Sequence, residues 1–400
     1  MIKVLHIIQG YGGGVSSLVR NLIVASDKSC ICQDVMSFIY ENGEEFIKCL
    51  NQCGSKTFLM PRPRKSGYKN FKDYVLKVMK DGGYDAVHCH SDGWRAVIFK
   101  KLAKKAGIKL FCIHAHRTSN NPGFIQNNSI YLKFNRFLSR KNADIKFACG
   151  TEAARFIYGD CDDYVTIPNG IDLNKCNRVL SKNRAELRNN LNVRENDIVV
   201  FHAGRFVVQK NHGFIIDIAD KLRENNVNFK LLLAGSGDLE PHVKALIEEK
   251  RLEDNVMLLG RRNDIYELMY ASDCVILPST SEGLPTVVME SQVMGTPCLV
   301  SDNVTAECDM KLGLVKFLSI NSVGPWIESL TNLNEFRASS REVIVDTFNK
   351  NAFTSAGSFQ RYLSTLQLKL GELFLISGAS NENSIYNRQL SRRRCRKSCF

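Results

Sequence analysis

Short apolar runs alternate with longer amphipathic segments along most of the chain. In the first part of the sequence, such runs predict strands at Lys3–Ile8, Asp34–Ile39, Lys56–Met60, Ala86–His90, Lys109–His114, Ile145–Cys149 and Val165–Ile167. The segments between them have helical spacing and predict helices over Ser16–Ala25, Glu44–Gln52, Asn70–Lys80, Trp94–Lys105 and Ile130–Ser139. This alternation is typical of a parallel sheet covered by helices.

The alternation stops over Leu173–Glu195, which is polar with few apolar repeats, and then resumes. Further strands are predicted at Ile198–His202, Phe229–Ala234, Val256–Leu259, Cys274–Leu277 and Cys298–Ser301. The helices predicted between them are Gly213–Arg223, Leu239–Glu249, Ile265–Tyr270 and Thr286–Met294. We therefore expect an α/β protein with two doubly wound domains. Ligands bind outside the carboxyl ends of such strands, so the two sets of strand ends can face each other across a cleft.

The same pattern divides the chain into segments. We expect a first domain over residues 1–173, a linker over 174–195, a second domain over 196–350, a C-terminal helix over 351–377 that packs back towards the first domain, and a tail over 378–400. The tail ends in SRRRCRKSCF, and the residues before this run have no periodicity. A basic, low-complexity segment of this kind is expected to be disordered.

Composition supports a globular protein of two domains. The chain has 400 residues, 44% of them hydrophobic and 24% charged, which is too long for one ordinary core. No run approaches the roughly 20 apolar residues that span a bilayer, and the N-terminus lacks the features of a signal peptide. The 14 cysteines are scattered without zinc-site spacing. We therefore expect a reduced, cytoplasmic protein without a disulfide framework.

A net charge of +13 indicates an anionic partner or a surface that only keeps the protein soluble. The segment Arg62–Lys80 is basic, with Tyr68, Phe71 and Tyr74 interleaved. Such a segment suits an anionic membrane surface, although a solvated helix face has the same pattern. No nucleic-acid-binding module is visible, so nucleic acid is not expected as a partner. The expected location is the cytoplasm, with peripheral attachment to the inner face of the cell membrane.

Two loops that follow strands in the second half have the chemistry of a phosphate site. Gly204 and Arg205 close a strand, and Lys210 follows shortly after. The glycine lets the backbone approach a ligand, while the two cations can neutralise a diphosphate. Gly235 and Gly237 occupy the corresponding turn after the next strand. Solvated surface cations and an ordinary strand-to-helix turn would explain each loop taken alone.

The third loop, SEGLPT, leads into a helix. Its free backbone N–H groups, from Gly283, Leu284 and Thr286, can form an anion site or simply bind water. Glu282 precedes the helix, and Glu290 lies within its apolar run. A carboxylate in an apolar run needs a partner, and a ribose diol is a suitable one. A capping Glu282 and a solvated Glu290 are the alternative.

These residues also carry a resemblance. Several sequence blocks occur in the order seen in retaining GT-B glycosyltransferases of family 4: IPNGID, GRFVVQKN, LLLAGSGD and EGLPTVVME. The resemblance covers roughly residues 1 to 370. It implies two Rossmann-like domains facing across a cleft, with the acceptor side in the first and the nucleotide-sugar donor site in the second. It further implies that Arg205 and Lys210 bind the donor diphosphate, Glu282 contacts the donor sugar and Glu290 the ribose. The basic tail is not part of the pattern.

The first half offers candidates for the other side of the cleft. Gly12, Gly13 and Gly14 follow the first strand with a spacing that does not fit a dinucleotide fingerprint, so a nicotinamide site is not expected. In the family it resembles, this loop borders the cleft near the phosphate or the acceptor. His116 ends the fifth strand and is preferred to His114 as a sugar-binding residue, a role the resemblance supports. His88 and His90 rank lower.

The sequence thus predicts a retaining transfer of a sugar from a nucleotide diphosphate sugar, with UDP favoured. The acceptor is a saccharide or a lipid-linked molecule, in the synthesis of a cell-surface polysaccharide such as a capsule or exopolysaccharide. No cofactor or metal is expected, because the histidines come without a carboxylate set. Two alternatives remain at this point: a nucleotide-sugar epimerase on the same fold, and a catalytically silent GT-B partner subunit.

Overall fold

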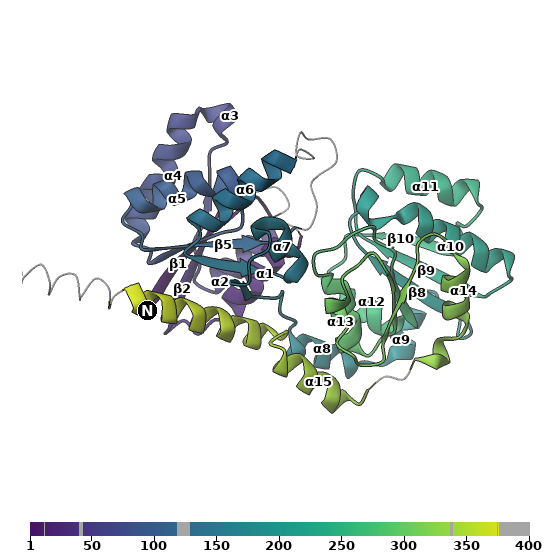
Figure 1. Ribbon diagram of the computed structural model, residues 1–400. Coiled ribbons are helices and arrows are strands. Elements are labelled where there is room, and N and C mark those ends of the chain that lie inside the picture. The colour runs from purple at the N-terminus through teal and green to yellow at the C-terminus, as the bar shows by residue number, and fades with distance from the viewer. Residues whose placement is uncertain (12, 40–42, 118–128, 337–338, 374, 376–400) are drawn as a thin grey trace, which may run out of the picture.

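The computed structural model describes residues 1–11, 13–39, 43–117, 129–336, 339–373 and 375. It consists of two α/β units placed side by side, each built on a parallel sheet (Figure 1). The chain passes through the first unit, crosses to the second, and returns to the first at its C-terminal end (Figure 1). Gly12 and the predicted tail over 378–400 lie outside the described residues.

The first sheet has seven strands in the order β3-β2-β1-β4-β5-β6-β7, all of them parallel. They are β1 (Ile2–Ile8), β2 (Ile31–Ser37), β3 (Thr57–Leu59), β4 (Ala86–Cys89), β5 (Leu110–Ala115), β6 (Ile145–Ala148) and β7 (Val165–Thr166). The strand order reverses between β1 and β4, which gives the sheet a switch point there.

Helices cover both faces of the first sheet. On one face, apolar side chains pack from α1 (Gly14–Val24), α2 (Glu44–Gln52) and a helix over residues 355–373. On the other face lie α4 (Tyr68–Gly82), α5 (Gly93–Lys105) and α7 (Thr151–Tyr158). The short α3 (Pro63–Ser66) precedes α4, and α6 (Ser129–Asn142) packs against α5 and α7.

The second sheet repeats this architecture with six strands in the order β10-β9-β8-β11-β12-β13. They are β8 (Ile198–Ala203), β9 (Phe229–Ala234), β10 (Val256–Gly260), β11 (Cys274–Leu277), β12 (Cys298–Ser301) and β13 (Val315–Leu318). One face is covered by α8 (Leu173–Leu180), α12 (Ile265–Ala271), α13 (Thr286–Met294) and α15 (Arg341–Lys350), and the other by α10 (His212–Glu224), α11 (Glu240–Glu249) and α14 (Gly324–Thr331). Single turns of 3₁₀ helix occur at η2 (Val208–Lys210), η3 (Ala306–Cys308) and η4 (Leu333–Glu335). The predicted class, two doubly wound α/β domains, is confirmed.

The segment expected to be a linker has a different structure. It forms α8 and α9 (Arg184–Asn189), which pack on α12 and α13 of the second unit. Asp172 caps α8 by accepting hydrogen bonds from two backbone N–H groups, and Cys176 and Val179 are buried below. Two helices this short contain too few apolar positions for the period of 3.6 residues to stand out in the sequence.

The chain crosses between the units twice, and the two crossings run side by side. The N–H of Ile171 donates to the carbonyl of Phe353, and the N–H of Ser355 donates back to Ile171, each over 2.9 Å. A Cβ on Gly170 would lie 2.7 Å from the backbone nitrogen of Ser355, so this position requires glycine. The glycine in the IPNGID block therefore serves the packing of the two crossings. Within the described ranges, no helix is long and apolar enough to cross a membrane.

Candidate active site

A cavity of about 740 Å³ lies between the two units at the carboxyl ends of both sheets. Its walls come from the loops after β1, β5, β6 and β7 in the first unit and after β8, β9, β10 and β11 in the second. The loops after β1, β8 and β11 lie at the switch points of the two sheets, which is where doubly wound folds bind ligands.

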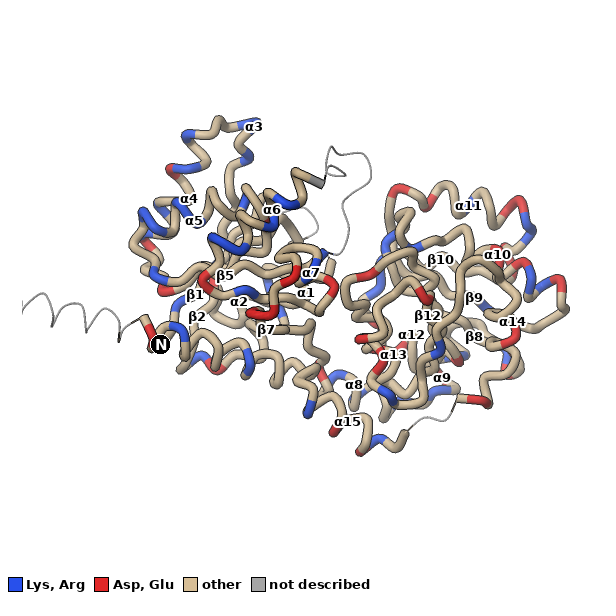
Figure 2. The backbone as a smooth tube through the Cα atoms, in the orientation of Figure 1, with Lys and Arg blue, Asp and Glu red and all other residues tan. Residues whose placement is uncertain are grey.

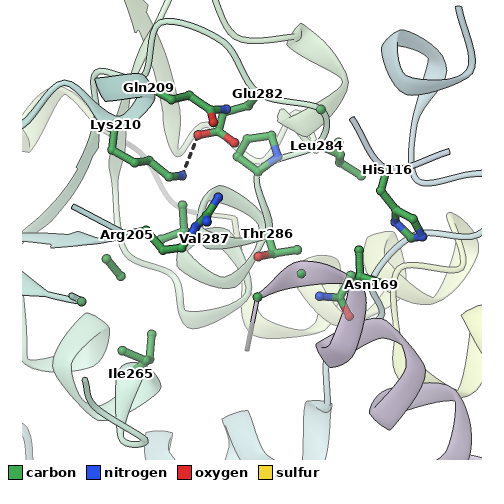
Figure 3. Close-up of a pocket in the computed structure, with 18 of the residues that line it drawn as sticks. His116, Asn169, Arg205, Gln209, Lys210, Ile265, Glu282, Leu284, Thr286 and Val287 are labelled. Atoms are coloured by element: carbon green, nitrogen blue, oxygen red, sulfur yellow. Dashed lines mark hydrogen bonds and ion pairs between the residues drawn. The ribbon is translucent and has the colours of Figure 1, made fainter. Parts of the chain in front are cut away.

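The first unit contributes the start of α1 and the end of β5. Gly13 and Gly14 line the cavity. Gly13 has a φ of 112°, a backbone conformation that residues other than glycine rarely adopt. His116 lines the cavity from the loop after β5 (Figure 3), whereas His114 is buried in the sheet. The preference for His116 over His114 as the residue that lines the cleft agrees with this placement.

The second unit contributes a carboxylate and several cations, among them Lys210 and Arg205. Lys210 and Glu282 form an ion pair of 2.6 Å in the cavity wall, with side chains only 17% and 13% exposed (Figure 3). Gln209 joins their two loops, because its side chain donates to the carbonyl of Ser281. Arg205 lines the same cavity and is exposed. This end of the cavity therefore carries a net positive charge.

The glycines of the second unit serve loop packing as well as the cavity. A Cβ on Gly235 would lie 1.8 Å from the carbonyl oxygen of Gly204, and one on Gly237 would lie 2.5 Å from that of Phe206. Gly204 and Gly235 line the cavity, whereas Gly237 is not among the lining residues. At Gly235 and Gly237, the missing Cβ therefore allows the close approach of the neighbouring loop.

The start of α13 faces the cavity. Gly283, Leu284 and Thr286 line it, and the helix begins at Thr286. The first N–H groups of a helix have no intrahelical partner and attract anions. Together with Arg205 and Lys210, they make this wall suitable for a diphosphate.

Glu290 occupies a different environment from Glu282. The helix starts after Glu282, so the two carboxyls do not share a helical face, and Glu290 is not among the residues that line the cavity. Burial raises the pKa of Glu290 to about 7. The charges of Lys175 and Arg20 and a hydrogen bond from Tyr266 act in the opposite direction. Because Arg20 belongs to α1, the first unit acts electrostatically on a carboxyl of the second.

The histidines of the first unit lie together. Ring nitrogens of His6, His88 and His90 come within 4.8 Å of one another, and so do those of His90, His114 and His116. Either group has a spacing that could hold a metal ion. Sequence analysis considered His88, His90, His114 and His116 but not their grouping with His6, because the cluster forms only when the strand register brings three separate strands side by side.

Sequence reasoning also missed several residues in the wall, namely Arg117, Asn169, Arg261 and Arg262. Asp92 holds Arg117 through two hydrogen bonds of 2.9 and 3.0 Å. All four residues lie in loops that follow predicted strands, and that position was the available signal.

The fold and the cationic cavity between the units define a GT-B protein. A solved structure of HepE from Anabaena in complex with UDP-glucose superposes with a TM-score of 0.75 at 18% identity, covering 92% of this chain and 100% of that one. At that identity the likeness shows the fold alone.

Sequence comparisons then give the family. The model of the family described as "Glycosyl transferases group 1" matches residues 183–310. A putative glycosyltransferase, EpsF of Bacillus subtilis (strain 168), is 31% identical over 356 residues, which are 86% of this chain and 91% of the relative. An Escherichia coli protein named UDP-Gal:alpha-D-GlcNAc-diphosphoundecaprenol alpha-1,3-galactosyltransferase is 28% identical over 290 residues, 69% of this chain and 74% of that one. The chain belongs to the group 1 glycosyltransferases.

Proposed function

We propose that the protein transfers a sugar, with retention of configuration, from a UDP-sugar to a saccharide or lipid-linked acceptor in the synthesis of a cell-surface polysaccharide. The observation that carries the proposal is the convergence of Arg205, Lys210 and the start of α13 on one wall of the inter-unit cavity. This wall suits the diphosphate of the donor, and the resemblance to family 4 supports retention.

In the proposed reaction, the bond between the anomeric carbon and the diphosphate breaks while the acceptor oxygen bonds to the same face of the sugar. Arg205, Lys210 and the N–H groups of α13 stabilise the negative charge of the leaving group. Each such preorganised donor contributes about 3 to 4 kcal/mol. The departing phosphate oxygen takes the proton of the acceptor hydroxyl, so that no separate protein base is required. No metal takes part, since the cations replace it at the diphosphate.

The remaining predicted residues have supporting roles in this proposal. Glu282 contacts the donor sugar beside the diphosphate, where its ion pair with Lys210 holds it. Glu290 binds the ribose, and His116 binds a sugar hydroxyl from the opposite wall. Gly13 and Gly14 let the start of α1 approach the phosphate or the acceptor.

A lipid-linked acceptor would bring the protein to a membrane, and we propose that the first unit attaches it. Lys and Arg line α3 to α6 of this unit (Figure 2). Phe71 of the predicted basic segment is buried in the core, so it is not available to lipid. Instead, α6 exposes Ile130, Phe134 and Phe137 at helical spacing, with exposed fractions of 73%, 55% and 49%. Exposed apolar residues among cations are typical of a helix that lies on an anionic membrane.

The test is incubation of the purified protein with a panel of nucleotide sugars, with and without lipid-linked saccharides extracted from membranes. Released nucleoside diphosphate identifies the donor, and NMR of the product gives its anomeric configuration. A product with the donor's configuration is expected. An inverted product would refute retention. Conversion of the donor sugar without acceptor would identify an epimerase, and binding without conversion would identify a silent partner subunit.

A further inference from the structure

Three neighbouring strands of the first sheet place five histidines on one face. His6 of β1 pairs in register with His88 of β4, which pairs with Cys112 of β5. Side chains at paired positions of parallel strands point to the same face, and so do those two residues further along each strand. His90, His114 and His116 therefore lie on this face too, as their ring contacts confirm.

Hydrogen bonds connect three of these rings into a chain that ends at the cavity. Gln33 Oε1 lies 2.9 Å from His6 Nε2. His6 Nδ1 lies 3.2 Å from His90 Nε2, and His90 Nδ1 lies 2.8 Å from His116 Nε2. This hydrogen-bonded chain of side chains crosses β2, β1, β4 and β5 in turn and reaches the cavity wall at His116.

The inner end of the chain determines its direction. The side-chain Nε2 of Gln33 donates to the carbonyl of Leu22, so Oε1 is the atom that faces His6. An amide oxygen only accepts, so His6 must donate from Nε2 and keep Nδ1 unprotonated. His90 then donates from Nε2 to His6, and His116 donates from Nε2 to His90.

Each ring in the chain carries a single proton. Burial lowers the pKa of His6 to about 4 and that of His116 to about 3, and it also lowers the pKa of His90. The rings are therefore neutral near pH 7, and the only freedom left to each is the choice of tautomer.

The second pair of rings lacks such a fixed end. Tyr362 OH lies 3.0 Å from His88 Nδ1, and His88 Nε2 lies 3.1 Å from His114 Nδ1. A tyrosine hydroxyl can donate or accept, so either direction satisfies these contacts. Only the chain that begins at Gln33 imposes one tautomer on its last member.

We propose that Gln33, His6 and His90 are positioning residues that hold His116 in the Nε2–H tautomer. His116 then keeps an unprotonated Nδ1 and acts at the cavity only as a hydrogen-bond acceptor for a sugar hydroxyl. The acceptor role rests on the proposed function, whereas the tautomer does not. A site that accepts from a hydroxyl discriminates against a donor sugar that lacks this hydroxyl, because the buried acceptor is then left unpaired.

The tautomer can be read directly in the whole, ligand-free protein. Protonated and unprotonated ring nitrogens resonate in separate regions of a ¹⁵N spectrum, and the His116→Asn variant assigns the signals of His116. We expect a protonated Nε2 and an unprotonated Nδ1. A protonated Nδ1 in the unmodified protein would overturn the proposal without any further variant.

Gln33→Met removes the acceptor at the inner end of the chain and keeps the side-chain length. The His116 ring should then show both tautomers, and kcat/KM for the UDP-sugar should fall on the order of tenfold, as for one lost hydrogen bond. Gln292→Met is the matched control, because Gln292 is an equally buried glutamine that bonds to backbone groups in the second unit. It should leave the tautomer unchanged. An unchanged tautomer in Gln33→Met would refute the chain.

The two proposals fail separately in this experiment. The expected tautomer without any sugar transfer would refute the proposed function and leave the proposed hydrogen-bonded chain of histidines intact.

Titration with Zn²⁺ tests whether these rings bind a metal ion instead. A metal needs an unprotonated nitrogen on every ligand, whereas the chain puts a proton between each pair of rings. Stoichiometric, tight Zn²⁺ binding that His90→Asn abolishes would identify a metal site instead and would overturn the proposal.

Discussion

Arg205 and Lys210, the two cations proposed to bind the diphosphate, differ in what their removal leaves behind. Arg205 is exposed, whereas Lys210 is the partner of the mostly buried Glu282. Changing either residue to Ala should lower kcat by roughly 100-fold, because each is proposed to stabilise the leaving diphosphate. Only Lys210→Ala should also lower Tm, since it leaves a carboxylate without its counter-charge. Steady-state kinetics and calorimetry measure the two effects.

Lys221→Ala is the control for this pair of variants. Lys221 pairs with Glu224 near the exposed end of α10, outside the cavity, and its loss should change neither kcat nor Tm. Full activity in both cavity variants would refute the proposed diphosphate site. Equal Tm values for Arg205→Ala and Lys210→Ala would show that the ion pair does not stabilise the fold.

Glu290 should make the stability of the protein depend on pH. Burial raises its pKa to about 7 from 4.5, so between these values the native state holds a proton that the unfolded state has released. Stability from this group therefore falls as pH rises through that window. Glu290→Gln cannot ionise, so its Tm relative to the unmodified protein should rise between pH 5 and pH 8. A constant difference in Tm would contradict the raised pKa.

At the level of elements, the helices of the first unit lead to a prediction about membranes. Changing Lys65, Lys69 and Lys72 to Gln should reduce binding to anionic vesicles more than tenfold, because each cation near the surface contributes about 1 kcal/mol. Phe134→Ser with Phe137→Ser should reduce it as well, and this loss should persist at high salt, which screens only the charges. Sedimentation with vesicles measures both.

Two controls decide which part of the chain binds. A control variant changes three exposed lysines of the second unit to Gln, namely Lys221, Lys244 and Lys350. It loses the same charge and should leave vesicle binding nearly intact. Removal of residues 378–400 separates the contribution of the basic tail. If this truncation abolishes binding while the first-unit variants still bind, the tail is the attachment and the helices are only a solvated surface.

Continuous apolar runs bounded by polar or turn residues made most of these elements predictable. Phe229–Ala234, Cys274–Leu277, Cys298–Ser301 and the helix over Thr286–Met294 were placed correctly at both ends. The strand β13 was missed because its four residues include a lysine and stand at the sheet edge, where burial is incomplete. The helix α7 was missed because eight residues give only two turns in which to recognise a period.

The cavity was predictable where the order of the strands alone brings its residues together, and unpredictable where the strand register decides. Arg205, Lys210 and Glu282 follow strands whose carboxyl ends had to meet, so their common location followed from topology. The histidine chain depends on the register of β1, β4 and β5 to within one residue, because a shift of one residue would turn the rings to the other face. Periodicity does not determine register.

At the level of the whole molecule, side-chain contacts join the two units across the cavity. Glu307 accepts a hydrogen bond of 2.9 Å from the backbone N–H of Thr151 at the start of α7, and Asn263 donates to Glu45 over 3.3 Å. Glu307→Ala should therefore open the free protein slightly, which small-angle scattering would detect as a larger radius of gyration. KM should rise a few-fold at constant kcat, since one exposed hydrogen bond contributes about 0.5 to 1.5 kcal/mol.

Glu328→Ala is suited as the control, because Glu328 is exposed on α14, far from the contact between the units. It should change neither the scattering curve nor KM. A fall in kcat for Glu307→Ala, with KM unchanged, would contradict a role in closure and would indicate a role in the chemical step.

The ribosome makes the helix over 355–373 long after the strands that this helix covers. Tyr362 and Leu366 are fully buried against a cluster that includes Val4, Ala86 and Cys112. Synthesis runs at roughly 5–20 residues per second, so on the order of ten seconds or more pass between the synthesis of these strands and that of the helix that covers them. The nascent first unit therefore exposes this apolar face while the second unit is being made. For the same reason, an excised first domain must consist of two pieces, residues 1–172 joined to residues 355–373.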